Sequence, residues 1–505
     1  MNEPSGDSVW KLSRWRVAAV LAFVALNVAV YLVRIVSVWR YGKLFCSSGA
    51  EFVMIESVWK CMHNRPVYAN PFSFPFSLSL YNYLFYDSYA GLLRLIGAWD
   101  AAMMTWGRQF TLLFALAAAV AQWRLVRSLL NLRGLNSALS FTLAVGLWLC
   151  TSLVKYWAVT IRPDMAAVAL VMIALWVVVC QPRFAFVYAG VLLYLAWAFK
   201  QSVVLAFVAL CLWLLMQKRW RDLSIFVSVF AALVAGTLLI GSPEYRFDIL
   251  VAPQMVKGFT FGLPWIAHAV GTGLNAALLN IYWVAAPFVL AFASGGTRKI
   301  DARLRPLLFV FIVALIAGIV GMGKIGGASN YLFEALAAGS TLLQIAIFTV
   351  PGKLLTSLLF IGSIQPALQL TGAAIGYHVT GKRDMAAIAT TADYKNAAAL
   401  RDRLAMMKKP IFTTDGPLAL PWISTADNSP ALTIDPNFHE AARSRDQNGS
   451  IEGMLQRGEI PTVVLAPSDT TYLDSLNASY KNVGDSMQQG VLYTIYEFNP
   501  GSTQH

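Results

Sequence analysis

Apolar residues in this chain form long runs separated by short polar stretches. A membrane-spanning helix needs about 20 mostly apolar residues, and by that measure the sequence predicts about 11 spans. They lie near residues 17–38, 106–127, 136–157, 165–180, 184–199, 202–217, 222–241, 275–293, 305–322, 331–350 and 353–372. The pattern therefore predicts a polytopic α-helical membrane protein.

The basic residues fix the direction in which these spans cross. Lys and Arg concentrate in the short loops that stay inside, and one alternating assignment with a cytoplasmic N-terminus satisfies this rule throughout. The inward clusters are Lys11, Arg14 and Arg16; Arg124, Arg127 and Arg133; Arg183; Lys218, Arg219 and Arg221; Arg298, Lys299, Arg303 and Arg305; and Lys353. The first run is too long for a signal peptide and no cleavage pattern follows it, so we interpret it as an uncleaved span. An odd number of spans places the C-terminal region outside.

Two segments depart from the spanning pattern. The first outward loop, at about 39–105, contains Tyr81–Gly97, which is apolar enough to resemble a span. If it crossed, every later basic cluster would face outward, so we expect an interfacial or re-entrant helix. The chain from about 393 to 505 has a helix pattern at Tyr394–Met407, then short β-prone runs at 410–415, 462–466 and 492–498. This predicts a transmembrane domain at 1–376, a linker at 377–392 and a small α/β domain outside the membrane.

Composition supports the membrane assignment and locates the charge. The chain of 505 residues is 57% hydrophobic and only 13% charged, about half the charged share of a soluble domain. From Lys395 onward there are 9 Lys+Arg and 12 Asp+Glu, a net of −3, so the remainder carries +13 − (−3) = +16. Positive charge beside apolar spans sets topology and contacts anionic lipid, so nucleic acid is not an expected partner.

The five cysteines show no metal-binding spacing. Cys46 and Cys61 share the first outward loop and could form a disulfide in an oxidising compartment.

Residues with catalytic chemistry fall on or near the outward side. They are Glu51, Lys155, Arg162, Asp164, Lys200, Gln201, Arg246, Lys257, Lys324, Asn330, Tyr331 and Glu334. Each residue also has an ordinary structural explanation, such as a solvated acid in a loop, a residue that begins a helix or a lysine that snorkels to the membrane surface. These separate structural explanations would all have to apply on the same side of the membrane. The set of residues therefore predicts a single functional site on the outward side.

Three local patterns suggest what this site does. Glu51 follows the first span closely, where a carboxylate can act as a general base or hold a divalent metal. Lys200 interrupts a long apolar stretch and is costly there unless it meets an anion such as a lipid phosphate. The Gly-rich turn before Asn330, with Lys324 in it, could bind an anion at a helix N-terminus.

Several of these segments resemble those of a known family. Ala50-Glu51, the RPVYANP motif at Arg65–Pro71, RPDM at Arg162–Met165, KQ at Lys200–Gln201 and NYLFE at Asn330–Glu334 carry the likeness, which covers about 20–350. Together they resemble the GT-C glycosyltransferases, specifically the protein-mannosyltransferase-like and aminoarabinose-transferase-like group of bacterial inner membranes. The family usually has an Asp where this chain has Ala50.

The resemblance implies transfer of a sugar from a polyprenyl-phosphate donor to a glycolipid, glycan or protein acceptor on the outer face. It implies one inverting displacement, with Glu51 replacing the usual Asp as base and Asp164 orienting the acceptor or a metal; no cofactor is certain. Cations would stabilise the leaving phosphate, with Lys200, Arg246 and Lys324 first and Arg162 next. The remaining substrate-binding candidates are Tyr68, Gln201, Lys257, Asn330, Tyr331 and Glu334. The C-terminal domain would help select the acceptor or cover the site.

Three other functions fit parts of the pattern. A lipid-linked sugar flippase or transporter would place charges in cavities, but it would more often show mid-span breaks and a repeated half. A polysaccharide polymerase or ligase would use a pyrophosphate-linked donor instead. A non-catalytic assembly partner is consistent with Ala50.

Overall fold

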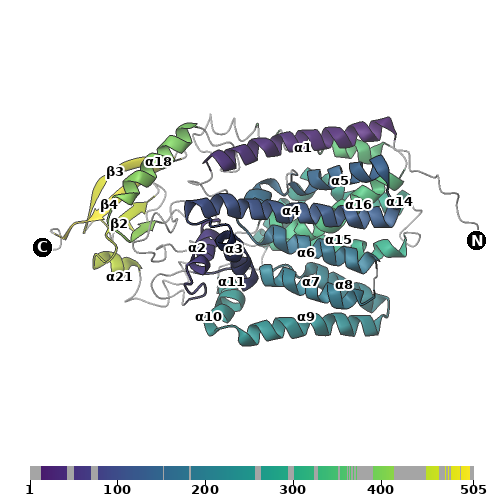
Figure 1. Ribbon diagram of the computed structural model, residues 1–505, viewed down its shortest axis with the longest axis horizontal. Helices are drawn as coiled ribbons and strands as arrows, with labels where there is room; N and C mark the ends of the chain where they lie inside the picture. The colour runs from purple at the N-terminus through teal and green to yellow at the C-terminus, as the bar shows by residue number, and fades with distance from the viewer. Residues whose placement is uncertain are drawn as a thin grey trace, which may run out of the picture.

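The computed structural model describes most of the chain. The described residues are 13–41, 51–69, 78–149, 151, 153–180, 183–255, 263–293, 301–323, 328–350, 353–360, 391–413, 451–465, 479–488 and 491–500, with isolated positions between 362 and 371 and between 472 and 476. Figure 1 shows a bundle of roughly aligned helices with a small sheet domain at one end.

The apolar runs form the helices of this bundle. They are α1 (Arg14–Tyr41), α4 (Ala101–Leu130), α5 (Gly134–Leu149), α6 (Asp164–Cys180), α7 (Ala185–Phe199), α8 (Leu205–Met216), α9 (Trp220–Ile240), α15 (Arg305–Met322) and α16 (Phe333–Thr349). Among the described residues, five helical segments are long and apolar enough to cross a membrane, and one bent pair could make a sixth. Shorter apolar helices, α5, α6, α7 and α8, pack between them. The protein is thus a polytopic helical membrane protein, as predicted.

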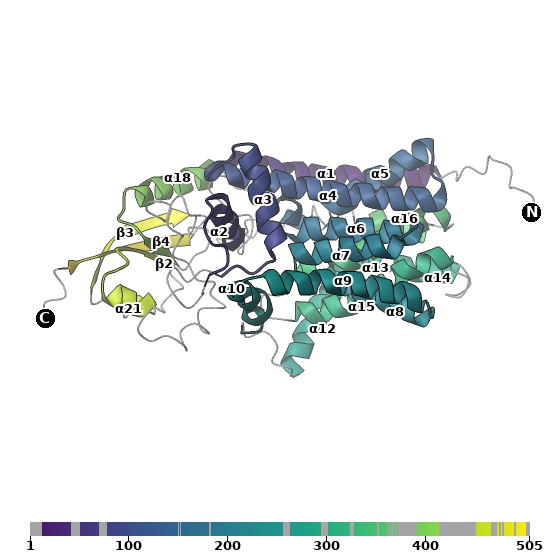
Figure 2. The same ribbon diagram turned by 60° about the horizontal axis from the view of Figure 1, so that its bottom comes forward.

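Burial distinguishes the centre of the bundle from its edge. In the span that contains α16, 94% of the most apolar window is buried, whereas the corresponding value for α9 is 6%. α16 is rich in small residues, and a Cβ on its Gly339 would lie 2.6 Å from the Trp283 ring. Small residues let membrane helices approach closely. α9 lies along the lower edge of the molecule in Figure 1 and faces the viewer in Figure 2, so most of its apolar surface is left for lipid.

The two ends of the bundle differ in chemistry. Arg16, near the start of α1, donates to the carbonyls of Ile347 (2.9 Å) and Val350 (2.5 Å) at the end of α16. Glu334 lies one helix length away, in the first turn of α16. The end that carries Arg16 is called the basic end, and the end that carries Glu334 is called the site end.

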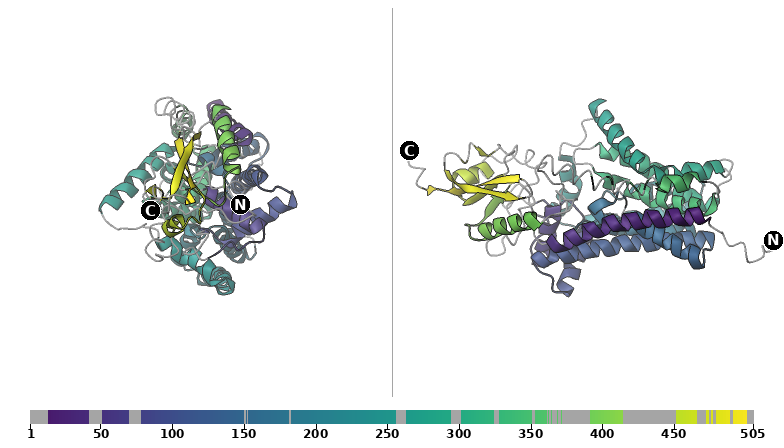
Figure 3. Two further views of the ribbon diagram at one scale, coloured as in Figure 1. Left: turned by 90° about the vertical axis from the view of Figure 1, so that its left-hand side faces the viewer. Right: turned by 90° about the horizontal axis from the view of Figure 1, so that it is seen from above.

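One predicted span is broken in the structure. Instead of a single helix over 275–293, α12 (Leu263–Leu279) is followed by α13 (Ile281–Val284) and α14 (Ala286–Ala293), and the segments bend by 92°. The Asn280 side chain donates to the Ala276 carbonyl (2.8 Å), and Pro287 has no N–H to continue the helix. α12 projects from the side of the bundle (Figure 2; Figure 3, right). The predicted span 136–157 also ends early, at Leu149.

Short helices gather at the site end. They are α2 (Glu51–Met62), α3 (Tyr83–Leu95), the 3-10 helix η1 (Lys155–Val159), α10 (Pro243–Arg246), the π-helix η2 (Phe247–Val251), α11 (Ala252–Met255) and the 3-10 helix η5 (Ser329–Leu332). α3 falls within the helix expected at Tyr81–Gly97. The segment 241–273, which lies between two predicted spans, is helical over most of its described length.

The C-terminal region forms a mixed sheet with helices. Its elements are α18 (Thr391–Ala405), β1 (Ile411–Thr413), α21 (Ile451–Gln456), β2 (Thr462–Leu465), β3 (Tyr480–Gln488) and β4 (Val491–Phe498). The strand order is β1-β2-β4-β3, with β1 parallel to β2 and the other pairs antiparallel. The predicted helix and strands are confirmed, and β3 and α21 are additional. The linker at 377–392 lies almost wholly outside the described residues, so the domain boundaries stay predictions.

Candidate active site

The predicted site residues that the structure describes gather at the site end, and most are buried. Glu51, Arg162, Asp164, Lys200 and Glu334 are each at most 7% exposed. They come from α2, the segment before α6, the turn between α7 and α8, and the start of α16. Burying a charged side chain in a membrane protein costs free energy unless the charge is paired. Each of these side chains has identifiable interaction partners.

Glu51 is held by a partner that the sequence reading missed. Arg108 of α4 donates to both carboxylate oxygens, through Nε (3.0 Å) and Nη2 (2.7 Å). The backbone N–H of Ile161 donates to the same carboxylate at 2.9 Å. Glu51 and Arg108 are 0% and 1% exposed. The pair therefore ties α2 to α4 and to the segment that leads into α6. A charged residue inside an apolar span was the available signal for Arg108.

A second buried cluster surrounds Asp164, the first residue of α6. Lys200 Nζ forms an ion pair with Asp164 Oδ1, and Asn330 Nδ2 donates to the same oxygen at 2.8 Å. Among the described residues, no hydrogen-bond donor reaches Asp164 Oδ2. Asp164 therefore keeps one carboxylate oxygen that can accept a proton.

Glu334 and Arg162 lie near this cluster. Glu334 accepts from the backbone N–H groups of Ala206 (2.8 Å) and Leu205 (3.4 Å), so it caps the N-terminus of α8. The Arg162 guanidinium lies 4.2 Å from the centre of the Trp157 ring. No acceptor reaches Arg162 Nε among the described residues. Glu334 thus has a clear structural role, and Arg162 keeps hydrogen-bonding capacity.

A small recess is lined by Asp164, Lys200, Asn330, Tyr331 and Glu334. Its volume is about 20 Å³, room for about one water molecule. It combines a cation, an amide and two carboxylates, so it holds both a group that can take a proton and a cation that can stabilise negative charge. A larger substrate can enter only when the surrounding side chains move.

Other predicted residues lie elsewhere or outside the described part of the chain. Gln201 donates to the Leu80 carbonyl (2.7 Å), and Arg246 donates to the Leu238 carbonyl (3.2 Å). Four predictions concern atoms outside the described part of the chain: Lys257, Lys324, the side chain of Lys155, and Cys46 of the expected disulfide. In the described part of the chain, no group of three or more His, Cys, Asp or Glu side chains is placed to hold a metal ion.

A further buried polar cluster lies between α2 and η2. Lys60 and Glu56, one turn apart on α2, form an ion pair at 2.9 Å. Asp248 Oδ2 accepts from the Ser79 N–H at 3.2 Å and is fully buried. Burial raises the pKa of the Asp248 carboxyl to about 8, although the Ser79 N–H and Lys60 oppose the rise.

The raised pKa of Asp248 predicts a pH dependence of stability. The folded state holds this proton up to about pH 8, whereas the unfolded chain loses it near about pH 4. Stability should therefore fall as pH rises through this window. We expect thermal unfolding curves to show this fall and Asp248→Asn to reduce it, with the exposed Asp87→Asn as control. A slope that is the same in wild type and Asp248→Asn would contradict the assignment.

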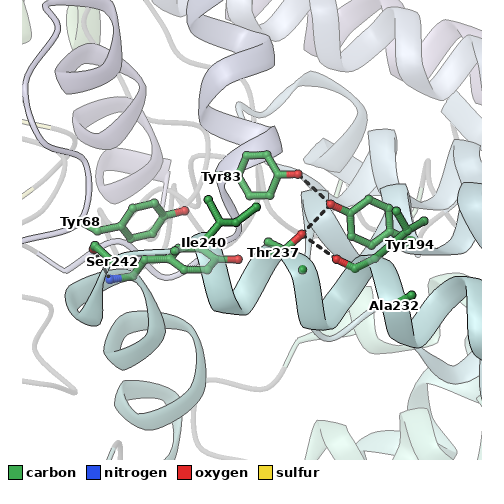
Figure 4. Close-up of a pocket in the computed structure, with 11 residues that line it drawn as sticks. Tyr68, Tyr83, Tyr194, Ala232, Thr237, Ile240 and Ser242 are labelled. Carbon is green, nitrogen blue, oxygen red and sulfur yellow. Dashed lines mark hydrogen bonds between the residues drawn. The ribbon is translucent and has the colours of Figure 1, made fainter.

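A larger pocket opens between α3, α7, α9 and α10. It has a volume of about 630 Å³ and is lined by Tyr68, Tyr83, Tyr194 and Tyr245, with Thr237, Ser242 and apolar residues of α9. Figure 4 shows the hydroxyls of Tyr83, Tyr194 and Thr237 joined in a chain of hydrogen bonds. We call this the tyrosine pocket. Of its residues the sequence reading had singled out only Tyr68.

Comparison with known proteins supports the fold. No family model matches the sequence, and no curated protein matches it. The crystal structure of ArnT from Cupriavidus metallidurans in the apo state superposes with a TM-score of 0.60 at 13% identity, covering 96% of this chain and 99% of that one. The crystal structure of the same protein bound to undecaprenyl phosphate gives a TM-score of 0.56, with the same identity and coverage. The chain therefore has the GT-C fold of ArnT, in agreement with the resemblance found in the sequence.

Proposed function

We propose that this chain is a membrane glycosyltransferase that moves a sugar from a polyprenyl-phosphate donor to an acceptor hydroxyl or amine. The observation that most strongly supports this proposal is the buried cluster of Asp164, Lys200 and Asn330, which lies at the site end of a chain with the GT-C fold. ArnT, which shares the fold, has been crystallised with undecaprenyl phosphate, and this supports the same class of lipid as donor here. The basic end would face the cytoplasm of a bacterial inner membrane, and the C-terminal domain would be periplasmic.

The cluster suggests a single displacement with inversion. The acceptor oxygen or nitrogen attacks the anomeric carbon while the bond from that carbon to the phosphate oxygen breaks. The acceptor proton passes to Asp164 Oδ2, the oxygen without a donor among the described residues. The polyprenyl phosphate leaves with the bonding electrons.

The ion pair of Asp164 and Lys200 couples these two events. Before reaction, the Lys200 ammonium is balanced by the Asp164 carboxylate. When Asp164 takes the proton it becomes neutral, and the ammonium is left to stabilise the charge that develops on the phosphate. Arg162 would supply a second cation. We therefore propose Asp164 as the general base in place of Glu51, which the sequence suggested. Both Glu51 oxygens are already bonded to Arg108.

Radiolabelled sugars test the activity directly. Purified protein in lipid nanodiscs would be supplied with a panel of polyprenyl-phosphate sugars and, in parallel, the corresponding pyrophosphate-linked sugars. We expect label from a monophosphate donor to enter the glycolipid, glycan or protein fraction of added membranes. Incorporation from pyrophosphate donors alone, or from no donor, would contradict the proposal.

A further inference from the structure

The hydroxyl groups of the tyrosine pocket have a fixed direction. Thr237 Oγ1 lies 2.9 Å from the Leu233 carbonyl, which can only accept, so the Thr237 proton is used there. Thr237 must then accept from Tyr194 (2.7 Å), and Tyr194 must accept from Tyr83 (2.9 Å). Burial raises the pKa of Tyr83 to about 12, so its phenol keeps the proton that it donates.

The remaining hydroxyls of the pocket also donate within the protein. Tyr68 donates to the Tyr81 carbonyl (2.7 Å), and Tyr245 donates to Asn82 Oδ1 (2.7 Å). The Ser242 hydroxyl accepts from the Tyr245 N–H (3.1 Å). The lining includes no charged side chain. The four tyrosines and Thr237 can therefore offer an occupant acceptor lone pairs, since each has one hydroxyl proton and that proton is already bonded.

This polarity determines which ligands fit. An anion such as a phosphate would meet oxygen lone pairs and no cation, so it would lose its hydration without compensation. A neutral ligand rich in O–H or N–H groups would donate to the lone pairs and place its C–H surface against the tyrosine rings, whose faces are electron-rich. The volume of about 630 Å³ lies within the range of about 300–1,000 Å³ typical of small-molecule sites.

Residues 80–83 connect the pocket to Lys200 of the charged recess, although the two cavities share no lining residue. The Tyr81 ring centre lies 5.8 Å from Lys200 Nζ, and Tyr83 lines the pocket. Asn82 anchors this segment, because its Nδ2 donates to the Trp197 carbonyl (2.6 Å). One short segment thus links the lysine of the recess to a pocket that no charged side chain lines.

We propose that the tyrosine pocket binds a neutral carbohydrate ring, and that this ring belongs to the acceptor. The second part rests on the proposed function, in which the donor is the anionic substrate and the acceptor carries the O–H or N–H. A glycan or glycolipid is then the acceptor class, and a protein side chain is not.

Two glycines provide a matched pair of variants. A Cβ on Gly236, which lines the pocket, would meet no atom within 4 Å, and the same holds for Gly271 on α12, which does not line it. Gly236→Leu should therefore fill the pocket without a clash at Cβ, while Gly271→Leu makes the same change elsewhere. Both replace a helical glycine, so neither should destabilise its helix.

Binding of radiolabelled octyl glucoside to the full-length protein in nanodiscs tests the pocket without relying on activity. Octyl phosphate and octanol serve as competitors with the same chain. We expect saturable glucoside binding that weakens at least about tenfold, or about 1.4 kcal/mol, in Gly236→Leu and stays unchanged in Gly271→Leu, with little competition from either competitor. Strong competition by octyl phosphate or octanol, or equal loss in both variants, would overturn the carbohydrate assignment.

A kinetic comparison tests the acceptor role separately. Gly236→Leu should raise the KM for the acceptor and leave the KM for the donor unchanged. A rise in the donor KM would overturn the acceptor role. Absence of any transfer by the wild type, together with intact glucoside binding, would count against the proposed function and not against the carbohydrate site.

Discussion

Replacing Glu51 with glutamine should lower the free energy of unfolding by about 3–5 kcal/mol, the usual cost of leaving a buried charge without its partner. The charge in question is Arg108, which is 1% exposed and bonded to both Glu51 oxygens. Denaturant unfolding in detergent measures the change. The expected loss is large because the pair joins α2, α4 and the segment before α6.

A double variant separates this structural role from catalysis. Glu51→Gln with Arg108→Met removes both charges and should recover most of the lost stability, since a buried ion pair can often be replaced by apolar groups of similar size. The refolded site should still transfer sugar. A double variant that is stable but inactive would instead identify Glu51 as the base, as the sequence suggested.

Replacing Asp164 with asparagine should reduce kcat by about 10²–10⁴-fold, the typical contribution of a positioned general base. Asparagine preserves the shape of the side chain but cannot take the acceptor proton. The reaction would also lose the coupling by which a neutralised Asp164 frees the charge of Lys200. Single-turnover transfer by variant protein, purified as a monodisperse species, provides the measurement.

Two controls accompany this variant. Asp222→Asn alters an acid paired with Arg219 (2.7 Å) in a partly exposed position at the basic end and should leave transfer unchanged. Denaturant unfolding of Asp164→Asn, compared with the wild type, shows whether the loss of activity comes from lost stability. Full turnover by stable Asp164→Asn would rule out Asp164 as the base.

The helical architecture could be predicted because apolar runs of span length leave few alternatives. The prediction failed where particular side chains interrupt a helix or where a strand lacks the usual hydrophobic pattern. Asn280 and Pro287 lie at the break in a run that is mostly apolar, and composition alone cannot locate such a bend. In the C-terminal domain, the apolar strand β4 was predicted, whereas its partner β3, YKNVGDSMQ, lacks the alternation that marks a half-buried strand.

The candidate site could be predicted as a set of residues but not as a set of contacts. Asp164, Lys200 and Asn330 could be singled out because they fall on the same predicted side of the membrane, and the structure brings them together. Arg108 was missed because its partner is 57 positions away. The tyrosine pocket has no local signature, since it is assembled from α3, α7, α9 and α10, and no short sequence window contains more than a fraction of it.

The most direct test of the central claim is to follow the leaving group. Purified protein would be mixed with a polyprenyl-phosphate sugar labelled with ³²P and with bacterial membranes as the source of acceptor. The account predicts that free polyprenyl phosphate accumulates with the wild type, requires the membranes, and falls to background with Asp164→Asn. Release that never occurs, or that proceeds equally well without Asp164, would contradict it.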